Sequence, residues 1–326
     1  MPAHQPNKVV DKNNPVAAAL LPAFRYQGVV LAPEGLRYSP NPDIIHPSVI
    51  ETDSQWDRPL ARFLMYYAPH DVPGGICLAF SEQPEGPWHE YDCNPLIASD
   101  WMPHYRVSHV SSPHAVWNPE EQRLFLYFHG ENDTTRFAVS RDGIHFEYGG
   151  VAVHTGMFEP GVSEASYARV FRLNRPHPKG SYVMLLMGNH KETRKVYVAW
   201  SRDGRRWAAE KPALIVPPPG TNQMGPGWLF AWESRFFILC YANREDSSVL
   251  DPISDLYLYE VDPDINQVTY CGMFMHHEVA GIGNARLSDP CLIQTPKRLF
   301  LFLNVGRRLR QRIALAVADM DSNNSV

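Results

Sequence analysis

The chain has 326 residues, 44% of them apolar, and a formal net charge of −5. This length allows two average domains or one large repetitive domain. The acidic balance argues against a nucleic-acid partner, and no apolar run reaches the length needed to span a membrane. The N-terminus lacks a basic-then-apolar signal, so we expect a cytoplasmic location.

Composition also points to a fold class. The chain has 29 Pro and 21 Gly, which mark many turns, and long helical patterns are rare. Five scattered cysteines do not form a disulfide framework. Cys77, Cys240 and Cys291 lie inside apolar runs and are expected to be buried thiols. These features predict an all-β protein with short strands.

The two ends differ from the rest of the chain. Residues 1–24 are polar and punctuated by proline, which predicts an N-terminal arm, and residues 321–326 form a C-terminal tail. Residues 25–320 are expected to fold as a single domain. Its first strand lies within Tyr26–Ala32 and stands apart from the strands that follow.

A unit of strand-like runs then recurs with a period of roughly 50 to 65 residues. In each unit an apolar run with a polar head precedes an aromatic-rich run. The five units begin with Ile44–Ile50, Val110–Trp117, Ser163–Phe171, Gly227–Trp232 and Leu287–Ile293. Four strands per repeat is the blade of a β-propeller.

The fifth unit has only three strands of its own. The strand around Val29–Ala32 can supply the fourth by pairing beside Ile313–Ala318, which would close the ring and leave no open sheet edge. We therefore expect a five-bladed β-propeller closed by an N-terminal strand. An aperiodic β-sandwich is the alternative, but it does not explain why the punctuation recurs in phase.

Tight turns supply part of this punctuation. Ser-Arg-Asp-Gly occurs at Ser140–Gly143 and again at Ser201–Gly204, at equivalent places in two units. Asp-Gly favours a hairpin turn, because glycine tolerates positive φ and aspartate bonds nearby amides. We expect these turns to be structural and not catalytic.

The same patterns resemble the propeller glycosidases, which include glycoside hydrolase families 32, 43, 62, 117 and 130. The resemblance lies in Ser-x-x-Pro-x-Gly-Pro-Trp at Ser81–Trp88, in the later Ser-x-Asp-Gly-x-x-Trp, and in His46-Pro47-Ser48 before a Tyr-Tyr strand. It covers about residues 25 to 320 and is more specific for architecture than for family. It implies a carbohydrate-active enzyme.

The resemblance also suggests catalytic residues. In family 43 an Asp-Pro in the first blade holds the general base, but here His46 occupies that position and Asp43 lies three residues earlier. The Asp-Pro dipeptide instead occurs at Asp289-Pro290. Glu164 resembles the Glu that opens a blade as general acid. We expect Glu164 as acid, Asp43 or Asp289 as base, and His46 as proton donor, orienting group or sugar ligand.

The first strands of propeller blades line the central channel, so their polar heads should converge. The further substrate-binding candidates are Arg106, His109, His114, Arg169, Trp228 and Arg286. Carboxylates in one cavity are what glycoside hydrolysis requires, because one protonates the leaving oxygen and another activates water or attacks the anomeric carbon.

No cofactor is expected to be required. His104, His109 and His114 lack zinc-site spacing, and nucleotide-binding motifs do not occur. Related propellers can hold a channel Ca²⁺ near a histidine, for which His276 and His277 are weak candidates.

The sequence thus predicts a glycoside hydrolase acting on a terminal sugar of an oligosaccharide, with inversion of configuration. The alternatives are a phosphate-dependent glycoside phosphorylase and a non-catalytic propeller that binds sugar or protein. A carbohydrate is the expected partner, and the sequence does not indicate an oligomeric state.

Overall fold

The computed structural model describes residues 17, 20–52, 56, 59–281 and 286–320. The fold is almost entirely β-structure. The 3₁₀ helices η1 (Pro33–Gly35), η2 (Thr155–Met157) and η3 (His277–Ala280) are short. No helix in the described ranges has both the length and the apolarity to cross a membrane.

Three separate sheets have four strands each. Sheet I contains β2 (Ile45–Glu51), β3 (Phe63–Ala68), β4 (Cys77–Ser81) and β5 (His89–Glu90). Sheet II contains β8 (Ser111–Asn118), β9 (Arg123–His129), β10 (Thr134–Ser140) and β11 (Phe146–His154). Sheet III contains β12 (Ser166–Arg172), β13 (Tyr182–His190), β14 (Thr193–Ser201) and β15 (Trp207–Ala209). The hairpin of β6 (Asp100–Trp101) and β7 (Tyr105–Arg106) lies between sheets I and II in sequence.

The remaining strands form one nine-stranded sheet with two parts. Part IV contains β16 (Thr221–Met224), β17 (Trp228–Trp232), β18 (Arg235–Arg244), β19 (Ser254–Val261) and β20 (Val268–Met275). Part V contains β21 (Arg286–Gln294), β22 (Arg298–Gly306), β23 (Arg312–Asp319) and β1 (Arg25–Leu31). Among the described residues, the two parts are joined by the parallel pair Ser254 and Arg286, and the Ser254 hydroxyl also donates to the Leu287 carbonyl.

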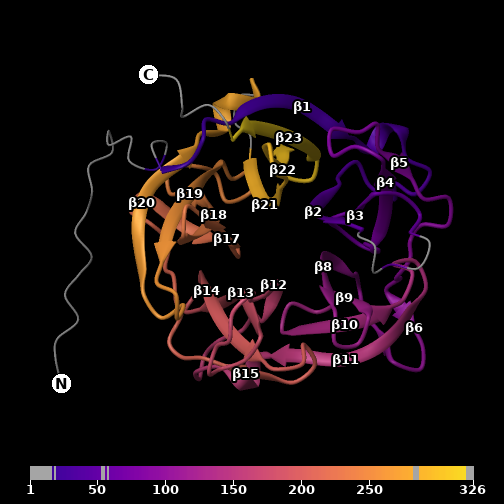
Figure 1. Ribbon diagram of the computed structural model, residues 1–326, viewed down its shortest axis with the longest axis horizontal. Helices are drawn as coiled ribbons and strands as arrows, with labels where there is room; N and C mark the ends of the chain where they lie inside the picture. Colours follow the sequence, from indigo (N-terminus) through magenta and orange to yellow (C-terminus); the bar gives the residue numbers. More distant parts are fainter. Residues whose placement is uncertain (1–16, 18–19, 53–55, 57–58, 282–285, 321–326) are drawn as a thin grey trace.

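The sheets are arranged around a common axis, as Figure 1 shows. The first strand of each unit (β2, β8, β12, β17 and β21) lies nearest the axis, and later strands lie toward the outside (Figure 1). Hydrogen bonds tie neighbouring inner strands: the Val49 amide donates to Cys291 Sγ, and the Ala115 amide donates to Ser48 Oγ. The heads of the inner strands are therefore brought together.

The N-terminal strand lies beside the C-terminal one. β1 pairs antiparallel with β23, with Val29 opposite Ala314 and Leu31 opposite Ile313. This is the pairing expected from the sequence. Within the predicted arm, Ala17 and Leu21 are buried, so the described part of the arm is packed against the core. The predicted tail lies outside the described residues.

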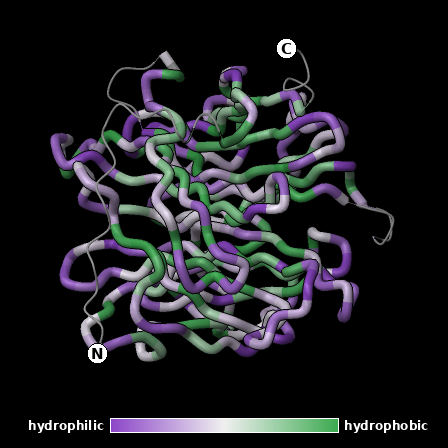
Figure 2. Tube along the Cα trace, turned by 60° about the vertical axis from the view of Figure 1, so that its left-hand side comes forward, coloured by the Kyte–Doolittle hydropathy of each residue, from purple (hydrophilic) through white to green (hydrophobic). Residues whose placement is uncertain are grey.

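The core lies between adjacent sheets. Leu124 and Leu126 of β9 pack in one cluster with sheet I, whereas Phe125 and Tyr127 pack in another with sheet III. Successive side chains of a strand point to opposite faces, so an unbroken apolar run is required where both faces are covered. Figure 2 shows hydrophobic segments running through the interior.

The five cysteines are free, and Cys77, Cys240 and Cys291 are buried as predicted. Cys271 is also buried, and Cys93 is exposed.

The Ser-x-Asp-Gly turns link one sheet to the next. The Tyr66 hydroxyl on β3 donates to the Gly143 carbonyl at 2.7 Å, and Tyr127 on β9 donates to Gly204 at 2.5 Å. Gly143 and Gly204 have φ of 74° and 76°, which glycine adopts without strain. The turns therefore have a structural role, as expected.

Candidate active site

Four inner strands carry the same irregularity at their heads. β2, β8, β12 and β21 each shift register near their start. A non-glycine residue with positive φ sits in each shift: His46 (60°), Ser112 (55°), Tyr167 (55°) and Asp289 (52°). Such bulges re-aim side chains, and strained positions of this kind cluster at functional sites.

Asp289 lies at the centre of a buried polar group. Its Oδ1 is 2.9 Å from His46 Nδ1 and 3.7 Å from Arg169 Nη2, and its Oδ2 accepts a 2.8 Å hydrogen bond from Asn304. Burial alone would raise the pKa of Asp289, but His46 and Arg169 outweigh it and hold that pKa below its ordinary value. Asp289 is therefore ionised at neutral pH.

His46 completes a histidine–aspartate pair. Burial lowers the pKa of its imidazole, and Asp289 only partly opposes this effect, so the ring is neutral near pH 7. Both ring nitrogens are buried and neither makes a hydrogen bond of good geometry among the described residues, but Nδ1 lies 2.9 Å from Asp289 Oδ1, whereas Nε2 has no such neighbour. A neutral imidazole with Nδ1 against a carboxylate can accept a proton at Nε2.

Aromatic rings and imidazoles surround this pair. The Tyr167 ring lies 5.1 Å from the His46 ring and 4.6 Å from that of His129, which in turn lies 5.6 Å from His109. Burial lowers the pKa of His129 well below its ordinary value. The sequence analysis missed Tyr167 and His129. Tyr167 could have been found, because it occupies the same place at the head of its unit as His46 does in the first unit.

Glu164 is the most accessible of the three candidate carboxylates. Its residue is 8% exposed, against 4% for Asp289 and 1% for Asp43. Both Glu164 oxygens accept hydrogen bonds from Arg194, at 2.9 and 3.0 Å. A general acid must donate through one oxygen, so an acid role requires Arg194 to release it.

Asp43 has different partners. Its Oδ1 accepts from the Gln311 amide, which fixes the turn between β22 and β23. Its Oδ2 is 3.4 Å from His70 Nδ1 and makes no hydrogen bond among the described residues. His70 therefore lies between Asp43 and the His46–Asp289 pair, and its ring is 6.3 Å from that of His46.

Arg286 faces Tyr241 at the same end of the strands. Its guanidinium lies over the Tyr241 ring at 5.7 Å, and the residue is 9% exposed. Arg286 and Asp289 lie on the same strand, three residues apart on β21, and Arg286 is among the groups that lower the pKa of Asp289. These contacts involve eight side chains at the heads of the inner strands or beside them, which we call the axial cluster: His46, Glu164, Tyr167, Arg169, Arg194, Tyr241, Arg286 and Asp289.

Three predicted ligands lie elsewhere. Arg106 is exposed in the β6–β7 hairpin and pairs with Asp100 at 2.9 Å. His114 donates from Nε2 to the Val170 carbonyl at 2.7 Å and packs 5.3 Å from the Trp228 ring. His114 and Trp228 are both buried in the core between inner strands. These contacts favour structural roles for the three residues, and their expected binding of sugar stays a prediction.

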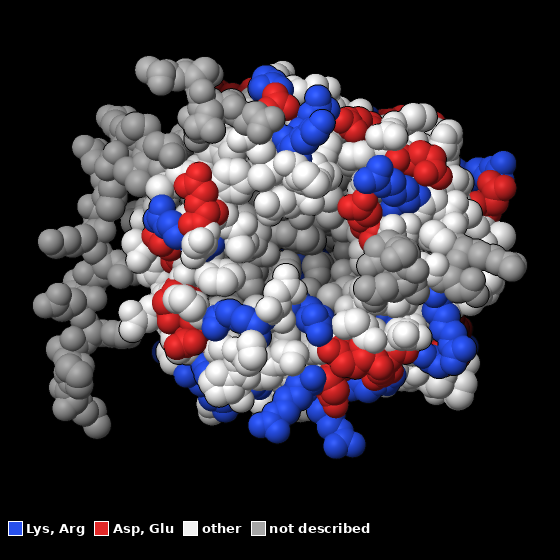
Figure 3. Space-filling model, viewed as in Figure 1, with Lys and Arg blue, Asp and Glu red and all other residues white. Residues whose placement is uncertain are grey.

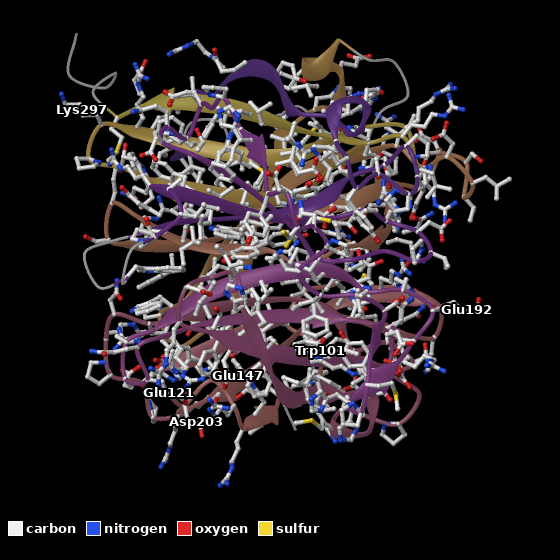
Figure 4. The ribbon with its side chains drawn as sticks, turned by 90° about the vertical axis from the view of Figure 1, so that its right-hand side faces the viewer. Trp101, Glu121, Glu147, Glu192, Asp203 and Lys297 are labelled. Atoms are coloured by element: carbon white, nitrogen blue, oxygen red, sulfur yellow. The ribbon has the colours of Figure 1, made fainter. Side chains whose placement is uncertain are left out.

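The face bearing the axial cluster is distinct from that of the interblade turns. In Figure 4, Glu192, in the turn before Arg194, lies at one end of the molecule, and Glu121, Asp203 and Lys297 lie at the other. Figure 3 views this second face, where acidic and basic groups lie side by side around a central hollow. Two surface grooves, lined in part by Glu85 and by Tyr270, include no axial-cluster residue.

His276 and His277 form a separate polar group with Asp255. Their donor atoms lie within 4.8 Å of one another. Ca²⁺ takes six to eight oxygen ligands, whereas two imidazoles and one carboxylate suit a transition metal better. Arg244 Nη1 also lies 3.5 Å from His276 Nε2. The group does not fit the Ca²⁺ that the family resemblance implies.

No family model matches the sequence, and a search of curated proteins finds no match. Solved structures do match. One described as a glycoside hydrolase superposes with a TM-score of 0.67 at 12% identity, covering 93% of each chain. The fold is that of the propeller glycosidases.

Other matches with this fold differ in activity. A structure described under the family 130 mannoside phosphorylases and hydrolases has a TM-score of 0.64 at 11% identity, covering 96% of each chain. An N-acetylgalactosamine deacetylase from F. plautii has a TM-score of 0.63 at 13% identity, covering 92% of this chain and 95% of its own. Likeness at this identity shows the propeller-glycosidase fold alone, and activity must be argued from the site.

Proposed function

We propose that the protein is a glycoside hydrolase that removes a terminal sugar from an oligosaccharide. In this proposal sheets I to III and parts IV and V are the blades of a five-bladed propeller that β1 closes, part IV carrying the additional short strand β16, and the axial cluster is the active site. The observation that carries the proposal is the meeting of three inner-strand heads: His46 lies 2.9 Å from Asp289, and its ring lies 5.1 Å from that of Tyr167, which follows Glu164 by three residues. A cytoplasmic location is part of it.

Glu164 is the proposed general acid and protonates the leaving oxygen. Arg194 would release one Glu164 oxygen as the substrate enters, which the partial exposure of the Arg194 side chain (35%) favours. Among the three candidate carboxylates, Glu164 has the greatest exposure, so it is best placed to reach a glycosidic oxygen.

His46 and Asp289 form the proposed base side. Asp289 holds Nδ1, and Nε2 takes a proton from the attacking water, which gives inversion when that water approaches opposite the acid. Asp289 alone is a weak base because its pKa is held low. In the pair, the His46 imidazole is the base and Asp289 keeps that imidazole oriented.

The test is Glu164→Gln, assayed on aryl glycosides and oligosaccharides that the wild type cleaves. Glutamine keeps the shape but cannot donate the proton, so turnover should fall by about 10² to 10⁴. A dinitrophenyl leaving group needs no acid and should recover much of the loss. Glu121→Gln is a matched control, because Glu121 forms a similar two-bond pair with Arg205 on the other face.

A result of undiminished turnover in Glu164→Gln would place the acid elsewhere. Cleavage of no glycoside by the wild type would favour the carbohydrate-binding propeller instead.

A phosphorylase is the second candidate, because Arg169 lies 3.7 Å from Asp289, Arg194 binds Glu164, and Arg286 precedes Asp289 by three residues on β21. Arginine binds phosphate bidentately. Turnover that requires inorganic phosphate and releases a sugar phosphate would select this alternative over hydrolysis.

A further inference from the structure

The axial cluster has more cationic than anionic side chains. Asp289 and Glu164 are its two carboxylates, and Arg169, Arg194 and Arg286 are its three guanidinium groups. Because burial keeps His46 neutral, three positive minus two negative charges leave the cluster at +1. The ion pairs and hydrogen bonds of the three arginines show which of them carries the excess positive charge.

Arg194 and Arg169 each have a carboxylate partner. Arg194 makes two hydrogen bonds to Glu164. Arg169 is 3.7 Å from Asp289, and its Nη1 donates to Ser112 Oγ and to backbone carbonyls. Asp289 also accepts from Asn304. Both oxygens of Glu164 are therefore occupied by Arg194, and Asp289 has its positive neighbours in His46 and Arg169, 2.9 and 3.7 Å from its Oδ1.

Arg286 is the unpaired cation. In the part of the chain that the structure describes, it has no ion pair within 4.0 Å, its buried Nε has no hydrogen-bond partner, and its guanidinium lies 5.7 Å from the centre of the Tyr241 ring. A charge that is nine-tenths buried without a hydrogen-bonded partner is costly. Binding an anion would remove that cost.

We propose that Arg286 binds a carboxylate of the substrate, so that the site prefers a uronic-acid residue to the corresponding neutral sugar. This inference rests on the proposed function for its carbohydrate ligand. A carboxylate matches the single excess charge, and the planar guanidinium fits it bidentately. The Tyr241 ring lies 5.7 Å from the Arg286 guanidinium and is an aromatic surface against which a sugar ring can pack.

The experiment measures binding, so it does not depend on turnover. D-glucuronate and D-galacturonate are titrated into the full chain beside D-glucose and D-galactose, with calorimetry or saturation-transfer NMR as the readout. At least one uronate should bind about tenfold or more tightly than its neutral counterpart, as expected for a charge-assisted pair. Arg286→Gln should abolish this preference and Arg286→Lys should keep part of it.

Arg235→Gln is the matched control, because Arg235 pairs with Glu260 at an exposed site on β18. It should leave the preference unchanged. Equal binding of uronate and neutral sugar by the wild type overturns the inference, as does a preference that survives in Arg286→Gln. Failure of all four sugars to bind also overturns it.

Two further outcomes separate this inference from the proposed function. Hydrolysis of neutral glycosides without uronate preference overturns the inference and leaves the hydrolase standing. Arg286-dependent uronate binding without hydrolysis of any glycoside supports the inference and overturns the hydrolase. Phosphate-dependent turnover that Arg286→Gln abolishes would make phosphate the anion and overturn the uronate preference.

Discussion

At the residue scale, partners decide what a candidate side chain can do. Asp289 could be selected from the sequence because it precedes a proline at the head of a strand. The partners of Asp289 could not be selected in this way, because His46 comes from another sheet and Asn304 from the end of a second strand. Which side chains meet at the axis depends on bulges, and a one-residue shift turns a side chain to the opposite face.

His114 shows the same limit. Its place near a strand head suggested a sugar ligand, but its side chain points between inner strands and bonds the Val170 carbonyl. Burial lowers the pKa of His114 to about 3, whereas an unfolded histidine titrates near its ordinary value of 6.5. This difference couples the stability of the fold to pH.

We predict that stability falls as the medium becomes acidic. Between pH 6.5 and about 3 the unfolded chain protonates His114 and the folded chain does not, so acid favours unfolding. A buried histidine of this kind changes the free energy of unfolding by up to about 1.4 kcal/mol per pH unit. Urea unfolding between pH 7.5 and 5 should show this slope, and His114→Asn should reduce it by about one proton.

The core substitution Phe128→Leu is the control for that experiment. It removes no titratable group, so it should lower the free energy of unfolding without changing its pH slope. An unchanged slope in His114→Asn would contradict the prediction.

At the element scale, the turn motifs were the most predictable part of the chain. Ser140 and Asp142 recur at Ser201 and Asp203, and in both turns the serine and aspartate accept from the turn amides. The partner tyrosine was not predictable, because it lies on a strand of the preceding sheet. The repeated motif therefore forms a local turn and also makes a contact with the preceding sheet.

We predict that Tyr127→Phe loosens the contact between sheets II and III. It removes the Tyr127 hydroxyl bond and leaves the buried Gly204 carbonyl with the 3.1 Å bond from Trp207 Nε1, which should cost about 0.5 to 1.5 kcal/mol of unfolding free energy. Chemical denaturation measures this, and turnover should not change, because the turn lies on the face opposite the axial cluster. Tyr148→Phe is the control, since the Tyr148 hydroxyl makes no hydrogen bond among the described residues, and an equal loss there would contradict the interpretation.

At the scale of the whole molecule, recurrence in phase was enough to predict the units and the pairing of the first strand with the last. Both follow from burial: a strand covered on both faces must be apolar throughout, and an unpaired edge must be covered. Access to the axis was not predictable, because it depends on how Arg194 and Tyr167 fill the space there. The pairing of β1 with β23 allows an experiment that tests whether β1 closes the ring of sheets.

We predict that β1 is required for a stable monomer. Deleting residues 1–32 removes β1 with its pairs to Val317, Ala316, Leu315, Ala314 and Ile313, and exposes the β23 edge. Exposed edges pair with other chains, so the shortened protein should self-associate and melt about 5 to 10 °C lower. Deleting residues 1–16 keeps β1 and the packed Ala17 and Leu21, so it should change neither property. Light scattering and thermal melts of the two truncations decide the matter, and a monomeric 1–32 deletion with unchanged melting would show that β1 does not close the ring.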